Sequence, residues 1–98
     1  AVPITQLIYA SRPFGDDPDQ VEDILRFARV RNPALGLTGA LVSRQDLYMQ
    51  MLEGPRMAVS DTFGRILQDD RHIEVALIHC GQAETRLFPD WSMRGVPM

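Results

Sequence analysis

The chain has 98 residues, of which 45% are apolar and 23% are charged, and it contains one cysteine. This length predicts a single domain over residues 1–98, with a core that needs neither a disulfide nor a structural metal. The formal net charge is −3, and the basic residues are arginines spread along the chain, which argues against a nucleic-acid partner. No apolar run approaches the roughly 20 residues that span a bilayer, and no signal segment opens the chain, so we expect a cytoplasmic protein without a membrane partner.

The first half of the chain predicts a strand, a loop and a helix. Residues 4–10 are rich in β-forming side chains, with Tyr9 on one of the two faces. Residues 11–17 contain proline, glycine and aspartate and predict a loop. The helix is expected to begin at Asp17 as its N-cap and to end at Pro33, because the residue before a proline avoids the helical conformation. Its predicted apolar stripe consists of Val21, Ile24, Leu25 and Ala28.

The second half predicts a hairpin, a helix and one or two further strands. Residues 37–43 and 47–53 read as strands joined by a tight turn. A second amphipathic helix is expected from Met57 onward. Residues 73–80 read as another strand, and a short final strand is expected within residues 87–93.

This order predicts an α+β, ferredoxin-like βαββαβ fold with a fifth strand as an optional addition. Two helices are expected on one face of a mixed sheet of four to five strands. The first and third strands are expected to be central, parallel neighbours. Such a topology alone does not identify a function.

Two side-chain amides stand out. Gln50 lies in the middle of a strand between apolar residues, and a buried amide without partners costs roughly 1–3 kcal/mol. A contact with Tyr9 on the neighbouring strand would satisfy it, either as a purely structural pair or as part of a site. Asn32 precedes Pro33, where asparagine often caps a helix or forms a turn, although its amide also complements a ring edge with adjacent N–H and C=O groups.

Other candidate sites have weak support. His72, His79 and Cys80 lack the spacing of a metal site, and Cys80 is expected to be a small buried apolar residue. Asp69 is most simply part of a solvated helix end. The sequence contains no glycine-rich phosphate-binding motif and no GxSxG motif.

Five segments together resemble the BLUF family, the flavin-binding blue-light sensors of bacteria. The resemblance runs from residue 6 to residue 93, in the family's order. Its segments are LIYASR, RNPALGLTGALV, YMQMLEGP, ILQDDRH and RLFPDWSM.

The resemblance implies roles for individual residues. Tyr9 matches the tyrosine that donates an electron and a proton after excitation, and Gln50 matches the glutamine between that tyrosine and the flavin. Asn32 matches the asparagine that binds the pyrimidine edge of the ring. Trp91 and Met93 match a pair that is implied to transmit the signal.

Further positions are implied to line the cofactor. Ile24 and Ile66 match the residues that sandwich the ring. Arg65, Asp69 and His72 match positions along the ring or the ribityl chain. Two positions depart from the family pattern. Arg31 stands where asparagine or histidine is usual, which places a positive charge near a flavin carbonyl. Tyr48 stands where phenylalanine is usual; its expected role is mainly packing, with a second hydrogen bond to the cofactor or competing electron donation as alternatives.

The resemblance implies a photoreceptor module and not an enzyme. Its cofactor is expected to be FAD, with FMN and riboflavin left open. Its output is expected to pass to an effector protein or a fused output domain, and self-association is also plausible. The alternatives are a cofactor-free ferredoxin-like protein-interaction module and an acylphosphatase-like hydrolase, which the acidic loop after the first strand disfavours.

Overall fold

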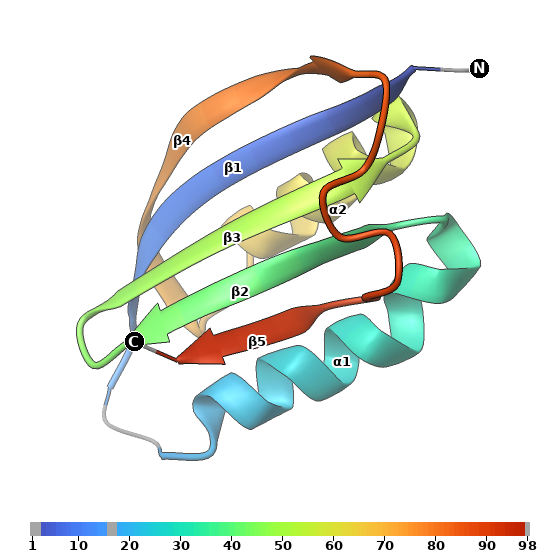
Figure 1. Ribbon diagram of the computed structural model, residues 1–98. Coiled ribbons are helices and arrows are strands. Elements are labelled where there is room, and N and C mark those ends of the chain that lie inside the picture. The colour runs from blue at the N-terminus through green and yellow to red at the C-terminus, as the bar shows by residue number, and fades with distance from the viewer. Residues whose placement is uncertain (1–2, 16–17, 98) are drawn as a thin grey trace.

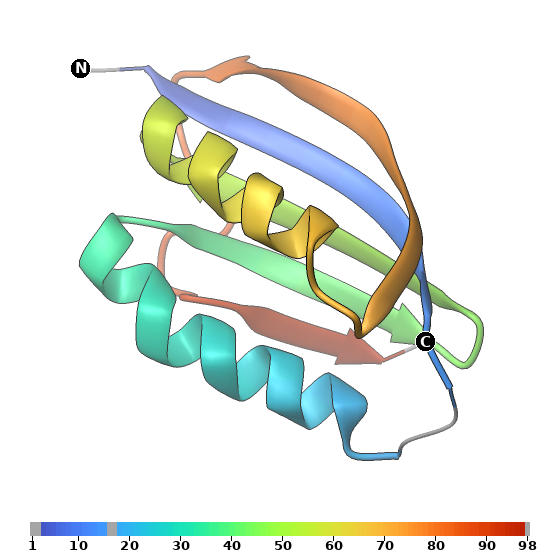
Figure 2. The same ribbon diagram turned by 180° about the vertical axis from the view of Figure 1, so that it is seen from behind.

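The computed structural model describes residues 3–15 and 18–97. Within them the elements follow the order β1 (Ile4–Pro13), α1 (Gln20–Leu35), β2 (Thr38–Arg44), β3 (Leu47–Gly54), α2 (Arg56–Leu67), β4 (His72–Ala83) and β5 (Arg94–Pro97). The strands form one sheet in the order β4-β1-β3-β2-β5. Both helices pack on the same face of this sheet, as Figures 1 and 2 show from its two sides. The predicted α+β, ferredoxin-like architecture is confirmed, and β5 is the additional strand.

The two central strands, β1 and β3, run antiparallel, with Tyr9 opposite Gln50. The prediction that these strands are parallel is wrong. A tight turn joins β2 and β3, which pair antiparallel, while the crossover through α1 leaves β1 and β2 pointing the same way. Because β3 lies between them, it runs against both. Among the described strands, only β5 pairs in parallel, with β2.

Strand β1 buries alternate residues from Thr5 to Ser11, so the predicted face that carries Tyr9 is confirmed. The strand continues to Pro13, into the segment that was predicted as a loop. This extension occurs because Arg12 and Pro13 pair with the first residues of β4.

Helix α1 follows Asp19, whereas the predicted cap Asp17 lies outside the described residues. Pro33 does not end the helix, contrary to the prediction. The helix ends instead at Gly36, which has a φ of 70° and donates its amide to the carbonyl of Pro33. This left-handed glycine cap satisfies the last carbonyls and lets the helix continue for two residues after the proline. Asn32 therefore lies inside the helix and not at its cap.

Strand β4 is an edge strand, so much of it is exposed. The prediction that Cys80 is buried is wrong for this reason: its side chain is exposed at the sheet edge. The final strand comprises residues 94–97 and not residues within 87–93. Neither of the described helices combines the length and apolar character needed to cross a membrane.

The connection from β4 to β5 is fastened to the end of β3 by Glu53, which is 0% exposed. Its carboxylate accepts hydrogen bonds from the backbone amides of Leu87 and Phe88, each at 2.7 Å. Arg86 adds a hydrogen bond from its Nη1 to the backbone carbonyl of Glu53 at 3.0 Å. These contacts fix the path of the segment that leads to Met93.

His72, the first residue of β4, is buried on the inner face of the sheet. Its Nδ1 lies 2.9 Å from the Ser11 hydroxyl oxygen, and its ring meets the rings of Tyr9 and Tyr48 edge-on. Burial lowers the pKa of the imidazole below 6.5, and this effect outweighs the opposing charge of Asp69. The fold therefore favours neutral His72.

Replacing Glu53 with glutamine should lower the free energy of unfolding by about 1–3 kcal/mol, because one buried backbone amide then faces an NH₂ group and loses its acceptor. Urea unfolding followed by circular dichroism measures this change. Glu84→Gln, at an exposed acid of the same connection, is the matched control and should change the free energy by less than about 0.5 kcal/mol. Equal midpoints for the wild type and Glu53→Gln would contradict the role of this carboxylate.

His72 should make the folded state less stable as the pH falls below about 6.5. The unfolded chain binds the proton near the ordinary pKa of 6.5, whereas the folded chain binds it only at lower pH, so acid favours unfolding. The measurement compares urea midpoints of the wild type and His72→Gln between about pH 7.5 and about pH 5. On acidification, the urea midpoint of the wild type should fall more than that of His72→Gln. A difference between the two midpoints that is independent of pH would refute the prediction.

Candidate functional site

A cavity of about 210 Å³ opens between α1 and α2, with β3 and the turn into β4 contributing to its floor. Pockets of this kind, mostly apolar with a few placed polar groups, are typical of cofactor sites. The lining includes Ile24, Arg31, Asn32, Gln50, Arg65, Ile66, Asp69 and His72, all of which the family resemblance assigns to the cofactor.

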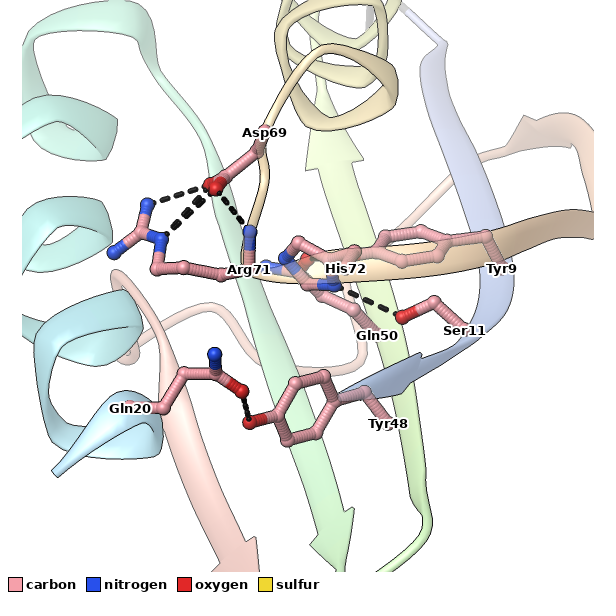
Figure 3. A network of polar contacts seen from close by, with 8 residues as sticks. All are labelled: Tyr9, Ser11, Gln20, Tyr48, Gln50, Asp69, Arg71 and His72. Atoms are coloured by element: carbon pink, nitrogen blue, oxygen red, sulfur yellow. Dashed lines mark hydrogen bonds and ion pairs between the residues drawn. The ribbon is translucent and has the colours of Figure 1, made fainter. Parts of the chain in front are cut away.

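Tyr9 and Gln50 form a buried pair beneath this cavity. They face each other across β1 and β3, and the Tyr9 hydroxyl donates a hydrogen bond to Oε1 of Gln50. The Gln50 side chain lines the cavity, and its Nε2 donates to Sδ of Met93 at 3.5 Å. Burial, with a further contribution from Asp69, raises the pKa of Tyr9 well above its ordinary value. The phenol is therefore neutral, and Gln50 connects it to the cavity (Figure 3).

Asn32 places a second side-chain amide in the lining and is 2% exposed. Its Nδ2 donates to the backbone carbonyl of Ser92 at 2.7 Å, which fixes the orientation of the amide. Within residues 3–15 and 18–97, no donor is hydrogen-bonded to its Oδ1. The Asn32 oxygen is therefore available as an acceptor for a molecule in the cavity.

The walls of the cavity are apolar on both sides. Ile24 and Ala28 come from α1, Ile66 comes from α2, and Leu52 lies on β3 beyond Gln50. Branched side chains on two facing helices suit a flat aromatic molecule, because each helix can cover one face of the ring and remove it from water.

Charged groups at the rim fall into two sets. Arg31 donates from Nη1 to the Thr62 hydroxyl at 2.9 Å, which links α1 to α2, and Arg65 lies one turn further along α2. Asp69 and Arg71 form an ion pair with a contact of 2.6 Å (Figure 3). Burial alone would raise the pKa of Asp69, but the hydrogen bonds from Arg71 bring it below its ordinary value. Asp69 is thus held in an ion pair and is not simply a solvated helix end.

Tyr48 lies outside the cavity lining. Its hydroxyl donates to Oε1 of Gln20 at 2.6 Å, and its ring meets the His72 ring edge-on (Figure 3). Tyr48, which was expected to contact the cofactor, therefore links β3 to the start of α1.

The structure also separates the two residues of the implied signalling pair. Met93 is 1% exposed and lies beside Gln50, and its backbone carbonyl accepts a hydrogen bond from Arg29 at 3.1 Å. Trp91 is 47% exposed, and the Arg94 guanidinium lies 5.5 Å from the centre of its ring. Met93, and not Trp91, contacts Gln50 in this structure.

Sequence reasoning missed part of the lining. The apolar positions share a helix face with Ile24 or a strand face with Gln50, and that periodicity was a usable signal. The other positions depend on how α2 and the following turn approach α1, which no local pattern reveals. The missed residues are Phe27, Ala28, Leu52, Thr62 and Arg71.

This lining fits an oxidised flavin. The apolar walls suit the two faces of the ring, and the amides of Asn32 and Gln50 suit its heteroatom edge. The described residues contain no group of three histidine, cysteine or acidic side chains that could hold a metal ion.

Comparisons with known proteins identify the family of the chain. The profile of the BLUF family, described as sensors of blue light using FAD, matches residues 4–94. Photoactivated adenylate cyclase subunit beta of Euglena gracilis is 34% identical over 91 residues, which are 92% of this chain and 10% of that protein. The blue light- and temperature-regulated antirepressor BluF of Escherichia coli is 34% identical over 86 residues, which are 87% of this chain and 21% of that protein. The chain thus spans only a small part of either relative.

Solved structures show the same fold. BlrB, described as a BLUF protein in its dark state, superposes with a TM-score of 0.93 and 40% identity over 97% of this chain and 73% of that chain. A bacterial light-regulated adenylyl cyclase superposes with a TM-score of 0.91 and 28% identity over 96% of this chain and 28% of that chain. With the profile match over residues 4–94, these similarities show that the chain belongs to the BLUF family of blue-light sensors that use FAD.

Proposed function

We propose that the cavity between α1 and α2 binds oxidised FAD without a covalent bond. The proposal is supported by the apolar walls at Ile24 and Ile66 and by the acceptor that Asn32 directs to the cavity. FMN and riboflavin carry the same ring, so the same walls and amides would accept them. FAD is the form that the family description names.

When bound, the flavin absorbs blue light and becomes a strong oxidant. Tyr9 would then give one electron and its phenolic proton to the excited flavin and regain both when the charge separation decays, so no net reaction would occur. During this cycle the amide of Gln50 rotates or tautomerises. A hydrogen-bond donor of Gln50 then faces a flavin carbonyl, which lowers the energy of the excited state and shifts the absorption band to the red.

The Gln50 rearrangement supplies the signal. Its Nε2 donates to Met93, so turning the amide removes that contact and changes the segment that leads to β5. Trp91, exposed two residues earlier, is the part of this segment that a partner would sense. We expect the signal to reach an effector protein or a fused output domain in the cytoplasm, while the domain itself performs no enzymatic reaction and is open to self-association.

A single arrangement carries this proposal: Gln50 lies in the cavity lining with a buried tyrosine hydrogen-bonded behind it. Purified protein reconstituted with FAD should be yellow. Blue light should move the flavin absorption band slightly to the red, with complete recovery in the dark. A protein that takes up no flavin would instead support a cofactor-free interaction module.

Tyr9→Phe should abolish the red shift while flavin remains bound, because the variant lacks the hydroxyl that donates to Gln50. The matched control is Tyr48→Phe, which removes the other buried tyrosine hydroxyl, outside the cavity lining. This control should keep the shift. Absorption spectra before and after illumination measure both variants. A normal light response in Tyr9→Phe would remove Tyr9 from the photochemistry.

A further inference from the structure

Two arginines at the cavity have no acidic partner. Arg31 and Arg65 both line the cavity, and neither forms an ion pair with a carboxylate in the described part of the chain. Arg31 is held in place by its hydrogen bond to Thr62. Burial lowers its pKa, and so does the nearby charge of Arg65, whereas Asp61 opposes them. The rim therefore concentrates positive charge that an anion in the cavity would offset.

The part of the cavity next to Phe27 is neutral by comparison. There Arg71 is paired with Asp69 through contacts as short as 2.6 Å. The net positive charge of the lining thus belongs to the Arg31–Arg65 end.

Hydrogen-bond chemistry indicates which part of a flavin lies at that end. The oxidised ring has one N–H group, which sits between its two carbonyl groups. Asn32 offers an acceptor in the lining, so this N–H group suits Asn32. Gln50, on the sheet side, could then hydrogen-bond one carbonyl group of the ring. The other carbonyl group would face two arginines, Arg31 next to Asn32 on α1 and Arg65 across the gap on α2.

We infer that Arg31 and Arg65 form an electrostatic site that favours negative charge on the carbonyl end of the flavin and so raises its reduction potential. This inference rests on the proposed function. An electron from Tyr9 leaves the tyrosine oxidised by one electron and adds one negative charge to the cavity before the phenolic proton follows. The two guanidinium groups gain and lose nothing, and their positive charges stabilise the added negative charge because both side chains line the same cavity.

The test is a reductive titration of the FAD-loaded protein with dithionite, followed by absorbance against a reference dye. Arg31→Gln and Arg65→Gln should each lower the midpoint potential. In the double variant, the ratio of the affinity for reduced flavin to the affinity for oxidised flavin should fall about tenfold. This corresponds to a midpoint potential about 30 mV lower for a two-electron couple. Added salt should reduce the difference between the wild type and the variants, because the guanidinium groups are partly exposed.

Three further variants separate charge from structure. Arg31→Lys keeps the charge, and Thr62→Val removes the hydrogen bond between the helices without changing the charge. Arg26→Gln removes a charge from the exposed side of α1, away from the cavity. Arg26→Gln should retain the potential of the wild type. Arg31→Lys and Thr62→Val keep the positive charge at the cavity, so each should lower the potential less than Arg31→Gln does.

Wild-type potentials in both Arg31→Gln and Arg65→Gln, with flavin bound, would overturn the inference. A fall in Thr62→Val as large as that in Arg31→Gln would also overturn it, because the hydrogen bond would then be responsible. If Arg31→Gln does not fold, Arg65→Gln decides the matter alone, since its side chain is exposed. Failure of the wild type to bind flavin would instead defeat the proposed function, so the two failures are distinguishable.

Discussion

The site depends on one buried hydrogen bond, from the Tyr9 hydroxyl to the Gln50 amide across the central strands of the sheet. A glutamine in the middle of a buried strand is costly unless both ends of its amide are satisfied. Its oxygen is satisfied by β1 and its nitrogen by Met93 before β5. The same amide also lines the cavity. A molecule that binds or absorbs light in the cavity is therefore connected through Gln50 to both β1 and the segment before β5.

The sheet and the helices contribute different things to the site. The sheet supplies the hydrogen-bonded Tyr9 and Gln50 pair, held by strand pairing, while the helices supply apolar walls and the charged rim. The segment before β5 joins the two, because Ser92 binds Asn32 of α1 and Met93 binds Gln50 of β3. Glu53 fastens the start of this segment to the sheet, so movement at Met93 occurs between fixed points.

Local patterns in the sequence were sufficient for much of this arrangement. The alternation of β1 put Tyr9 on one face with Thr5 and Leu7, and the need of a buried amide for a partner pointed to the contact between Tyr9 and Gln50. Interactions between distant segments were not accessible in this way. Pro33 was expected to end α1, but the helix continues through it to Leu35 and ends at the glycine cap, Gly36. Tyr48 was expected near the cofactor, yet Gln20 holds its hydroxyl elsewhere. Whether Met93 or Trp91 lies inside depends on the path of the connection that Glu53 fixes.

We propose that the Gln50 amide changes its hydrogen bond to a flavin carbonyl when Tyr9 is oxidised and restored. Light-minus-dark infrared difference spectroscopy of protein loaded with FAD that is ¹³C-labelled at its carbonyl carbons tests this most directly. A strengthened hydrogen bond weakens the C=O bond, so the labelled carbonyl band should move to lower frequency on illumination and return in the dark. An unchanged carbonyl band in a sample whose visible absorption responds to light would contradict the account.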